Sequence, residues 1–260
     1  MPRFELHPQR RVTVVTGASS GIGRATAELL GSAGYPVALG ARRLDRCEET
    51  AAAIRSSGGE AIAAPLDLLD GESIDAFVKT VESELGAIEV LVSNAGDVQP
   101  ITTVGAEPAE FARQLGVNLL GAQALVHRVV PAMLERHRGD VVFVTSEVAL
   151  YPRTNMAGYV ASKAGLENFA RAMAMECEGT GVRVGIVRPG PSNTEQGTTW
   201  NVDDVNTVVE SWQHWGLLRH SGALLPSALA EAVRAMVAAP KGTRYAVLEV
   251  QPEAPVVATD

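Results

Sequence analysis

Tyr159 and Lys163 are the residues whose types and spacing are best suited to chemistry. They stand four positions apart, so a helix places the phenol and the ammonium group on one face, one turn apart. Ser146 lies thirteen residues upstream, at the end of an apolar run. A carbonyl that receives hydride builds negative charge on its oxygen, and a proton donor within hydrogen-bond reach must meet that charge. A phenol, an amine and a hydroxyl that converge would meet this requirement.

The phenol of Tyr159 is the candidate general acid/base. A free tyrosine has a pKa of about 10, too high for ready proton exchange at neutral pH. The positive charge of Lys163 favours the phenolate, so we expect it to lower the pKa of Tyr159. Ser146 follows a predicted strand, and open α/β sheets bind ligands at that edge, where its hydroxyl can orient a carbonyl oxygen. The alternatives are a packing tyrosine and an ordinary hydroxyl at a strand end.

A glycine-rich turn near the start of the chain is the candidate cofactor site. It follows the strand-like residues 12–16 and contains Gly17, Ser19, Ser20, Gly21, Ile22 and Gly23. Glycines there let the backbone turn sharply and bring a phosphate to the helix N-terminus, where free N–H groups favour negative charge. The Gly-x-x-x-Gly-x-Gly spacing differs from the common Gly-x-Gly-x-x-Gly fingerprint, and a plain strand–helix turn is the alternative. With the phenol and amine, the turn indicates a carbonyl/alcohol oxidoreductase that uses a nucleotide cofactor.

Arg42 and Arg43 follow the second predicted strand and bear on the choice of cofactor. In dinucleotide-binding folds, an acidic residue at this strand end holds the ribose 2′-hydroxyl, while an arginine accommodates a 2′-phosphate. No acidic residue is present there, and guanidinium groups match phosphate geometry. The pattern favours NADP(H), with NAD(H) as the second possibility. Two arginines that only begin a solvated helix are the alternative.

Two further strand ends carry candidate cofactor contacts. Asp67, with Leu68 beside it, follows the third predicted strand and could accept a hydrogen bond from adenine or cap the next helix; both interpretations stay open. Asn94, Ala95 and Gly96 end the fourth strand, where small residues would let a cofactor lie against the backbone. A plain turn is the alternative there, because Asn and Gly are common turn residues.

Strand-like and helix-like stretches alternate along almost the whole chain. Continuous β-branched runs, rather than alternating ones, are typical of strands covered on both faces of a parallel sheet. This rhythm predicts an α/β, doubly wound parallel sheet of about seven strands with helices on both faces, in a single domain over 1–260. The predicted strands are 12–16, 36–40, 61–65, 88–93, 141–146, 182–187 and 245–250; the predicted helices are 21–33, 44–56, 74–85, 108–135, 157–178 and 227–238.

Residues 191–226 interrupt this rhythm as a long insertion before the last helix. All three tryptophans, Trp200, Trp212 and Trp215, fall within it. Long insertions in compact domains often form lids or binding loops. If this one closes over the site, the substrate pocket is largely apolar and suits a hydrophobic ketone, aldehyde or alcohol. Packing of these residues onto the core is the alternative.

Composition narrows the classes of partner. The formal charge of −8 disfavours nucleic acid and anionic membranes. We expect no signal peptide in residues 1–11, no span of ~20 apolar residues, and a cytoplasmic protein. The only cysteines, Cys47 and Cys177, lie far apart without metal-ligand spacing, so no metal site is expected.

Taken together, these motifs resemble the short-chain dehydrogenase/reductase family. The residues that carry the resemblance occur in the family's order and span 12 to about 194; they are Thr16, Gly17, Gly21, Gly23, Asn94, Ala95, Gly96, Asn118, Ser146, Tyr159, Lys163, Pro189 and Gly190. The resemblance implies a Rossmann-like fold, a nicotinamide cofactor and a catalytic group of Ser146, Tyr159, Lys163 and Asn118.

The resemblance also implies roles for individual residues. Lys163 would hold the ribose hydroxyls of the cofactor, and Asn118 would distort its helix and anchor a water leading to the lysine. Pro189, Gly190 and Thr194 would lie beside the nicotinamide. The helix over 108–135 and the helix carrying Tyr159 resemble the family's subunit contacts, so a homodimer or homotetramer is implied.

Two positions depart from the family's usual pattern. Ser93 stands where a second asparagine is frequent, and Glu147 stands where an apolar or small residue is common. The Glu147 carboxylate either faces solvent or borders the pocket and disfavours anionic substrates; both readings stay open. The favoured function is an NADP(H)-dependent oxidoreductase acting on a small apolar substrate. The alternatives are a lyase, dehydratase or epimerase on the same scaffold, and a non-catalytic nucleotide-sensing module.

Overall fold

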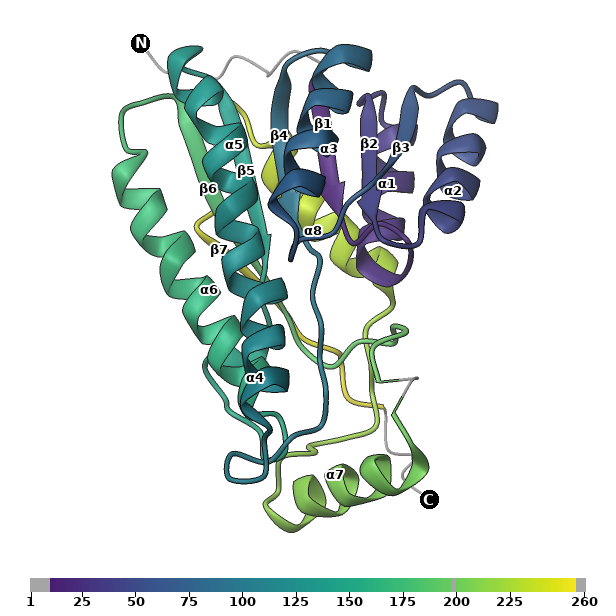
Figure 1. Ribbon diagram of the computed structural model, residues 1–260, viewed down its shortest axis with the longest axis vertical. Coiled ribbons are helices and arrows are strands. Elements are labelled where there is room, and N and C mark those ends of the chain that lie inside the picture. Colours follow the sequence, from purple (N-terminus) through teal and green to yellow (C-terminus); the bar gives the residue numbers. More distant parts are fainter. Residues whose placement is uncertain (1–9, 198–199, 256–260) are drawn as a thin grey trace.

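A seven-stranded parallel sheet forms the centre of the computed structural model, which describes residues 10–197 and 200–255 (Figure 1). Its strand order is β3-β2-β1-β4-β5-β6-β7. The chain therefore runs outward from β1 to β3, returns to the other side of β1, and continues to β7. The strands are β1 (Val12–Thr16), β2 (Val37–Ala41), β3 (Ala61–Pro65), β4 (Ile88–Ser93), β5 (Gly139–Val144), β6 (Val182–Pro189) and β7 (Val247–Val250).

Helices cover both faces of this sheet, as predicted for a doubly wound fold. The helical elements are α1 (Gly21–Ser32), α2 (Leu44–Ser56), α3 (Gly71–Glu84), α4 (Pro108–Leu115), α5 (Gly121–Glu135), α6 (Ala157–Glu176), α7 (Val202–His214) and α8 (Pro226–Ala238), with η1 (Gly116–Leu120) and η2 (Glu147–Ala149) as short π- and 3₁₀-turns. One core joins the sheet to α3, α5 and α6, and a second joins it to α1, α2 and α8 (Figure 1).

The two cores explain the continuous apolar runs in the sequence. Every residue of β1, β2, β4 and β5 is buried. Because successive side chains of a strand point to opposite faces, Val14 packs into the core with α3, α5 and α6, and Val15 into the core with α1, α2 and α8. A polar residue at either position would be buried without a hydrogen-bond partner, which is costly.

Several predicted boundaries differ from the structure. The fifth strand begins at Gly139 and ends at Val144, so Ser146 follows the strand by two residues instead of ending it. The segment 191–226 contains a helix, α7, that was not among the predicted helices. Within α7 only Val208 is buried, and the start of the helix depends on Asn201, whose side chain accepts a hydrogen bond from the Asp204 amide at 2.8 Å. In Figure 1, α7 lies beyond the carboxyl edge of the sheet.

The predicted helix over 108–135 is continuous but irregular, because α4 and α5 are joined by the π-turn η1. Among the described residues, Pro108–Glu135 is the one helix long and apolar enough, by length and composition, to cross a membrane. Part of its surface packs against the sheet and α6, with Leu125, Val129 and Met133 in the core. Residues 1–9, which cover most of the region expected to lack a signal peptide, lie outside the described residues.

Candidate active site

A large cavity opens at the carboxyl edge of the sheet. Its volume is about 1690 Å³, above the 300–1,000 Å³ typical of a small-molecule pocket. Residues that follow β1, β2, β3, β4, β5 and β6 all line it. The strand order reverses between β1 and β4, and open α/β sheets bind ligands in the crevice at such a point. The cavity therefore has both the size and the position expected for a dinucleotide and a second molecule.

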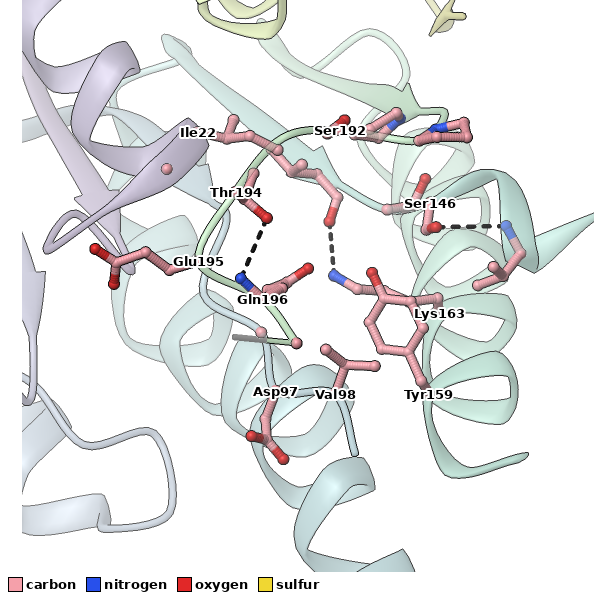
Figure 2. Close-up of a pocket in the computed structure, with 18 of the residues that line it drawn as sticks. Ile22, Asp97, Val98, Ser146, Tyr159, Lys163, Ser192, Thr194, Glu195 and Gln196 are labelled. Carbon is pink, nitrogen blue, oxygen red and sulfur yellow. Dashed lines mark hydrogen bonds between the residues drawn. The ribbon is translucent and has the colours of Figure 1, made fainter. Parts of the chain in front are cut away.

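Ser146, Tyr159 and Lys163 converge in this cavity (Figure 2). Ser146 caps the 3₁₀-turn η2, and its oxygen accepts a hydrogen bond from the Val148 amide at 3.4 Å. Tyr159 and Lys163 occupy the first turns of α6, where they are 7% and 2% exposed. The Lys163 amine donates to the Val144 carbonyl at 2.9 Å and lies 5.7 Å from the centre of the Tyr159 ring. A hydroxyl, a phenol and an amine thus meet where β5 ends.

Burial, rather than the neighbouring amine, dominates the pKa of Tyr159. It raises the pKa to about 12; a hydrogen bond with Ser146 opposes the rise and the charge of Glu147 adds to it. Burial also lowers the pKa of Lys163 to about 8. The expectation that Lys163 lowers the pKa of Tyr159 is therefore wrong, because burial of the phenol outweighs the effect of neighbouring charges. The phenol is held in its protonated form at neutral pH.

Asn118 lies in the π-turn η1, where the regular helix is interrupted. Its side chain is fully buried; its oxygen accepts from the Asp97 amide at 2.7 Å, and its nitrogen donates to the Asp97 carbonyl at 2.8 Å. The same nitrogen donates to the Ser162 hydroxyl at 2.9 Å, and Ser162 donates to the Tyr159 carbonyl at 2.8 Å. The amide thus joins the start of the loop after β4 to the start of α6, one residue from Lys163.

The glycine-rich turn packs closely against the loop after β4. A Cβ on Gly17 would lie 2.8 Å from the Ala95 Cα, and one on Gly23 would lie 2.4 Å from the Gly17 oxygen. Asn94 donates to the Thr16 carbonyl at 2.9 Å, and the Thr16 hydroxyl accepts from the Asn94 and Ala95 amides at 3.0 and 2.9 Å. Gly17 and Gly23 are therefore required by close packing, which leaves the backbone open to an approaching phosphate.

The ends of β2 and β3 bring polar groups to the same cavity. Arg43 donates to the Ser19 hydroxyl at 3.0 Å and to the Ser20 hydroxyl at 2.8 Å, so it already lies over the glycine-rich turn. Arg42 is exposed and lines the cavity. Leu68 is buried and also lines it. Asp67 also lines it, but does not cap α3: its carboxylate accepts from the Leu69 amide at 3.0 Å, while Asp70 is the helix cap. The capping interpretation of Asp67 is wrong because the helix begins four residues later, at Gly71, with Asp70 as its cap.

The segment after β6 lies beside these groups. Gly190 donates to the Val250 carbonyl at 2.8 Å, and a Cβ there would lie 2.2 Å from the side-chain oxygen of Gln251. Pro189, Gly190 and Thr194 all line the cavity. A Cβ on Gly21 would lie 3.4 Å from the side chain of Thr194, so this threonine covers the glycine-rich turn.

Apolar residues and one ion pair form the remaining wall near Tyr159. Val98, Val148 and Met156 pack with Tyr159, and Trp200 and Trp212 pack against them. Trp215 is 65% exposed and is not a lining residue. The insertion therefore contributes part, not all, of its aromatic content to the pocket.

Glu147 borders the cavity and is paired with Arg153. The two side chains are 13% and 12% exposed. The guanidinium of Arg153 also lies 4.8 Å from the centre of the Trp212 ring, a cation–π contact that joins η2 to α7. Of the two readings of Glu147, the pocket reading is the one that the structure supports, with the charge balanced by its partner.

Sequence reasoning placed Gly17, Ser19, Ser20, Gly21, Ile22, Arg42, Arg43, Asp67, Leu68, Asn94, Ala95, Gly96, Ser146, Tyr159, Lys163, Pro189, Gly190 and Thr194 at the site, and all of them line this cavity. Gly23 and Asn118 lie behind it. The sequence-based prediction did not include Ser162, Arg153 or Glu195. Ser162 had a usable signal, because it stands inside the Tyr159–Lys163 spacing, whereas the other two are recognisable only from their partners. Within the described ranges, no group of three or more His, Cys, Asp or Glu is placed to hold a metal ion.

Residues 11–204 match the family described as short chain dehydrogenase, which covers most of the chain. The chain belongs to this family. A short chain dehydrogenase of Pseudocercospora fijiensis is 36% identical over 209 residues, 79% of this chain and 67% of that protein. The 2,3-dihydro-2,3-dihydroxybenzoate dehydrogenase of Bacillus subtilis is 32% identical over 191 residues, 73% of each chain. This short-chain dehydrogenase is thus an oxidoreductase of the class that acts on CH–OH or C=O groups with NAD(P).

Solved structures agree with this assignment. The alcohol dehydrogenase of Thermococcus sibiricus, complexed with 5-hydroxy-NADP, superposes with a TM-score of 0.81 at 29% identity, covering 96% of this chain and 100% of that chain. The 3-ketoacyl-(acyl-carrier-protein) reductase of Brucella melitensis, complexed with NADH, has a TM-score of 0.79 at 27% identity, covering 93% and 96%. Both cofactor types thus occur among structures similar to this short-chain dehydrogenase.

Proposed function

We propose that this enzyme interconverts a small, mainly apolar ketone or aldehyde and its alcohol with NADP(H), and that Tyr159 is the general acid/base. The observation that carries the proposal is the meeting of Ser146, Tyr159 and Lys163 in the cavity that also contains the glycine-rich turn and two arginines. A phenolic proton donor beside a dinucleotide site has few chemical uses other than protonation of a carbonyl that accepts hydride.

The residues present fit a nicotinamide dinucleotide. Gly17 and Gly23 hold the backbone of the turn against the β4 loop, and the first two residues of α1 line the same cavity, where the N-terminus of a helix favours a phosphate. Arg42 and Arg43 line the cavity where β2 ends, which favours a 2′-phosphate. When bound, the nicotinamide would supply or accept the hydride.

The chain's own residues supply the proton chemistry in this proposal. Ser146 orients the carbonyl oxygen, and Tyr159 transfers its phenolic proton to that oxygen. Because its pKa is raised to about 12, Tyr159 is protonated at neutral pH and can donate its proton. Lys163, with a pKa of about 8, is protonated at pH 7 and stabilises the phenolate as it forms. Asn118 positions Ser162 and the start of α6, and thereby the phenol and the amine.

The wall near Tyr159 favours a substrate with an apolar body. Val98, Val148, Met156 and Trp200 offer hydrocarbon and aromatic surface beside the phenol. Glu147 and Arg153 carry opposite charges and satisfy each other, so the pair adds little net field to the pocket. A neutral ketone or secondary alcohol suits this wall better than a highly charged substrate does.

A panel of neutral ketones, aldehydes and alcohols tests the proposal, with NADPH/NADP⁺ and NADH/NAD⁺ run side by side. A stoichiometric change in absorbance at 340 nm with each turnover, at higher kcat/KM for the phosphorylated cofactor, is the expected result. Product formation without any change at 340 nm would instead favour a lyase, dehydratase or epimerase. Binding of a dinucleotide with no product from any substrate would favour a sensing module.

We also propose that the enzyme is a homodimer or homotetramer. The support is the long helix Pro108–Glu135, which leaves Leu120 62% exposed on its outer surface, and α6, which leaves Met175 75% exposed. Exposed apolar side chains on neighbouring helices are suited to a subunit contact. Light scattering coupled to gel filtration should give two or four times the 27.3 kDa chain mass, and a monomer mass would refute this proposal.

A further inference from the structure

The segment 193–197, called the strap here, lies across the cavity between its two ends. Thr194 contacts the glycine-rich turn, and a Cβ on Gly96 would lie 3.7 Å from the side-chain nitrogen of Gln196. Between these two residues, the side chain of Glu195 points away from the catalytic end of the cavity. Figure 2 shows Glu195 on the opposite side of the strap from Ser146, Tyr159 and Lys163. The strap therefore presents a carboxylate to the end of the cavity that is remote from the proton donor.

Two arginines receive this carboxylate. The Arg43 guanidinium donates to one oxygen of Glu195 at 2.8 Å, and Arg46 donates to the other at 2.7 Å. Hydrogen bonding from Arg43 and Arg46, with their charges, lowers the pKa of Glu195, so the carboxylate is ionised at neutral pH. Arg43 and Arg46 come from the end of β2 and the first turns of α2, whereas Glu195 comes from the far side of the sheet. No feature of the local sequence requires this meeting.

The same guanidinium also contacts the glycine-rich turn, through the hydroxyls of Ser19 and Ser20. One arginine thus joins the turn expected to hold the diphosphate to the strap. A guanidinium group binds a carboxylate and a phosphate with the same planar geometry. The carboxylate of Glu195 therefore holds the position of an anion at the adenosine end of the cavity.

We propose that Glu195 occupies, in the cofactor-free enzyme, the guanidinium site that receives the 2′-phosphate of NADP(H), and so sets the preference between NADP(H) and NAD(H). The inference rests on the proposed function. A 2′-phosphate carries more negative charge than one carboxylate, so it competes for Arg43 and Arg46 and displaces the strap. NAD(H) lacks that group and leaves the ion pairs with Glu195 in place. Glu195 thus weakens the binding of NADP(H) but not that of NAD(H).

Isothermal titration of the full chain with NADP⁺ and NAD⁺, without substrate, measures this directly. Glu195→Gln keeps the shape of the side chain and removes its charge. Exposed ion pairs are individually weak, so we expect Kd for NADP⁺ to fall by about three- to tenfold and Kd for NAD⁺ to change by less than about twofold. The Kd of adenosine 2′,5′-bisphosphate should fall in the same way as that of NADP⁺, and the Kd of 5′-AMP should not change.

Glu231→Gln is the matched control, because Glu231 is also exposed and paired with an arginine, Arg234, but on α8 away from the strap. It removes one negative charge and should leave both Kd values unchanged within about twofold. Three results for Glu195→Gln would each overturn the inference. They are an equal fall in Kd for NADP⁺ and NAD⁺, no change in either Kd, and a rise in Kd for NADP⁺. If the unaltered enzyme binds neither dinucleotide, the proposed function itself fails, and that result is distinct from the other three.

Discussion

Replacing Lys163 by methionine should expose the energetic cost of a buried amine. The Lys163 amine is almost fully removed from water, and its hydrogen-bond acceptor is an uncharged group, the Val144 carbonyl. Burial lowers its pKa from 10.5 to about 8, so the folded protein holds the proton less tightly than the unfolded chain does. Methionine fills a similar volume without a charge. It also leaves the Val144 carbonyl unpaired, at a cost of about 1–3 kcal/mol.

The sign and size of the effect follow from the two pKa values. Because the folded pKa is depressed, the amine opposes folding; the penalty is full below about pH 8 and disappears as the pH rises toward 10.5. Each pKa unit is worth about 1.4 kcal/mol, so the full penalty is roughly 3 kcal/mol. Between pH 7 and pH 9.5 the unaltered enzyme should therefore gain about 2 kcal/mol of unfolding free energy relative to Lys163→Met.

Urea unfolding of the cofactor-free protein, followed by circular dichroism at several pH values, measures this difference. Titration of other groups affects both proteins alike and cancels. Lys79→Met, which removes an exposed amine from α3, reports the effect of losing one surface charge. If the difference between the enzyme and Lys163→Met is the same at pH 7 and pH 9.5, the amine does not titrate in this window. The account of Lys163 as a desolvated, weakly paired group would then be wrong.

Three further substitutions test other parts of the site. Tyr159→Phe should lower kcat by about 10²–10⁴, the usual contribution of a placed proton donor, while Kd for the cofactor stays within about twofold; near-normal turnover would remove Tyr159 from the mechanism. Arg42→Ala should raise KM for NADPH much more than KM for NADH, and equal effects would contradict a role at the 2′-phosphate. Gly23→Ala should destabilise the fold by about 1–3 kcal/mol in urea unfolding, because its Cβ would lie 2.4 Å from a backbone oxygen. Gly71→Ala is its control, because a Cβ there would have no neighbour closer than 3.9 Å, and it should leave the free energy of unfolding nearly unchanged. Equal losses of stability in the two variants would contradict the packing argument.

The architecture was predictable because local chemistry and burial determine it. Strands such as β1 and β4 are rich in β-branched and apolar residues that do not alternate with exposed polar ones, and only a sheet covered on both faces buries every residue of such runs. α7 was missed for the opposite reason. Its apolar residues Val205, Val208 and Trp212 do recur at helical spacing, but the helix lies beyond the edge of the sheet and buries only Val208, so the strand–helix rhythm of the core did not predict it.

The site was predictable to the extent that its residues follow strand ends. Parallel strands bring their carboxyl ends to one edge, so a motif after any strand must approach the motifs after its neighbours. This is why the glycine-rich turn, Asn94 and Ser146 meet, although more than fifty residues separate each from the next. The expected pKa of Tyr159 failed because it considered charge without burial, and burial is a property of the assembled fold.

The sequence by itself determined the sheet, the family and the group of residues that faces the cavity, because periodicity, glycine positions and motif order are properties of the chain. Only the tertiary structure decided which side chains pair across that cavity. Glu147 with Arg153, and Glu195 with Arg43 and Arg46, meet because loops from different strands pass the same edge. The paths of those loops depend on packing against distant elements, and no local pattern encodes such contacts.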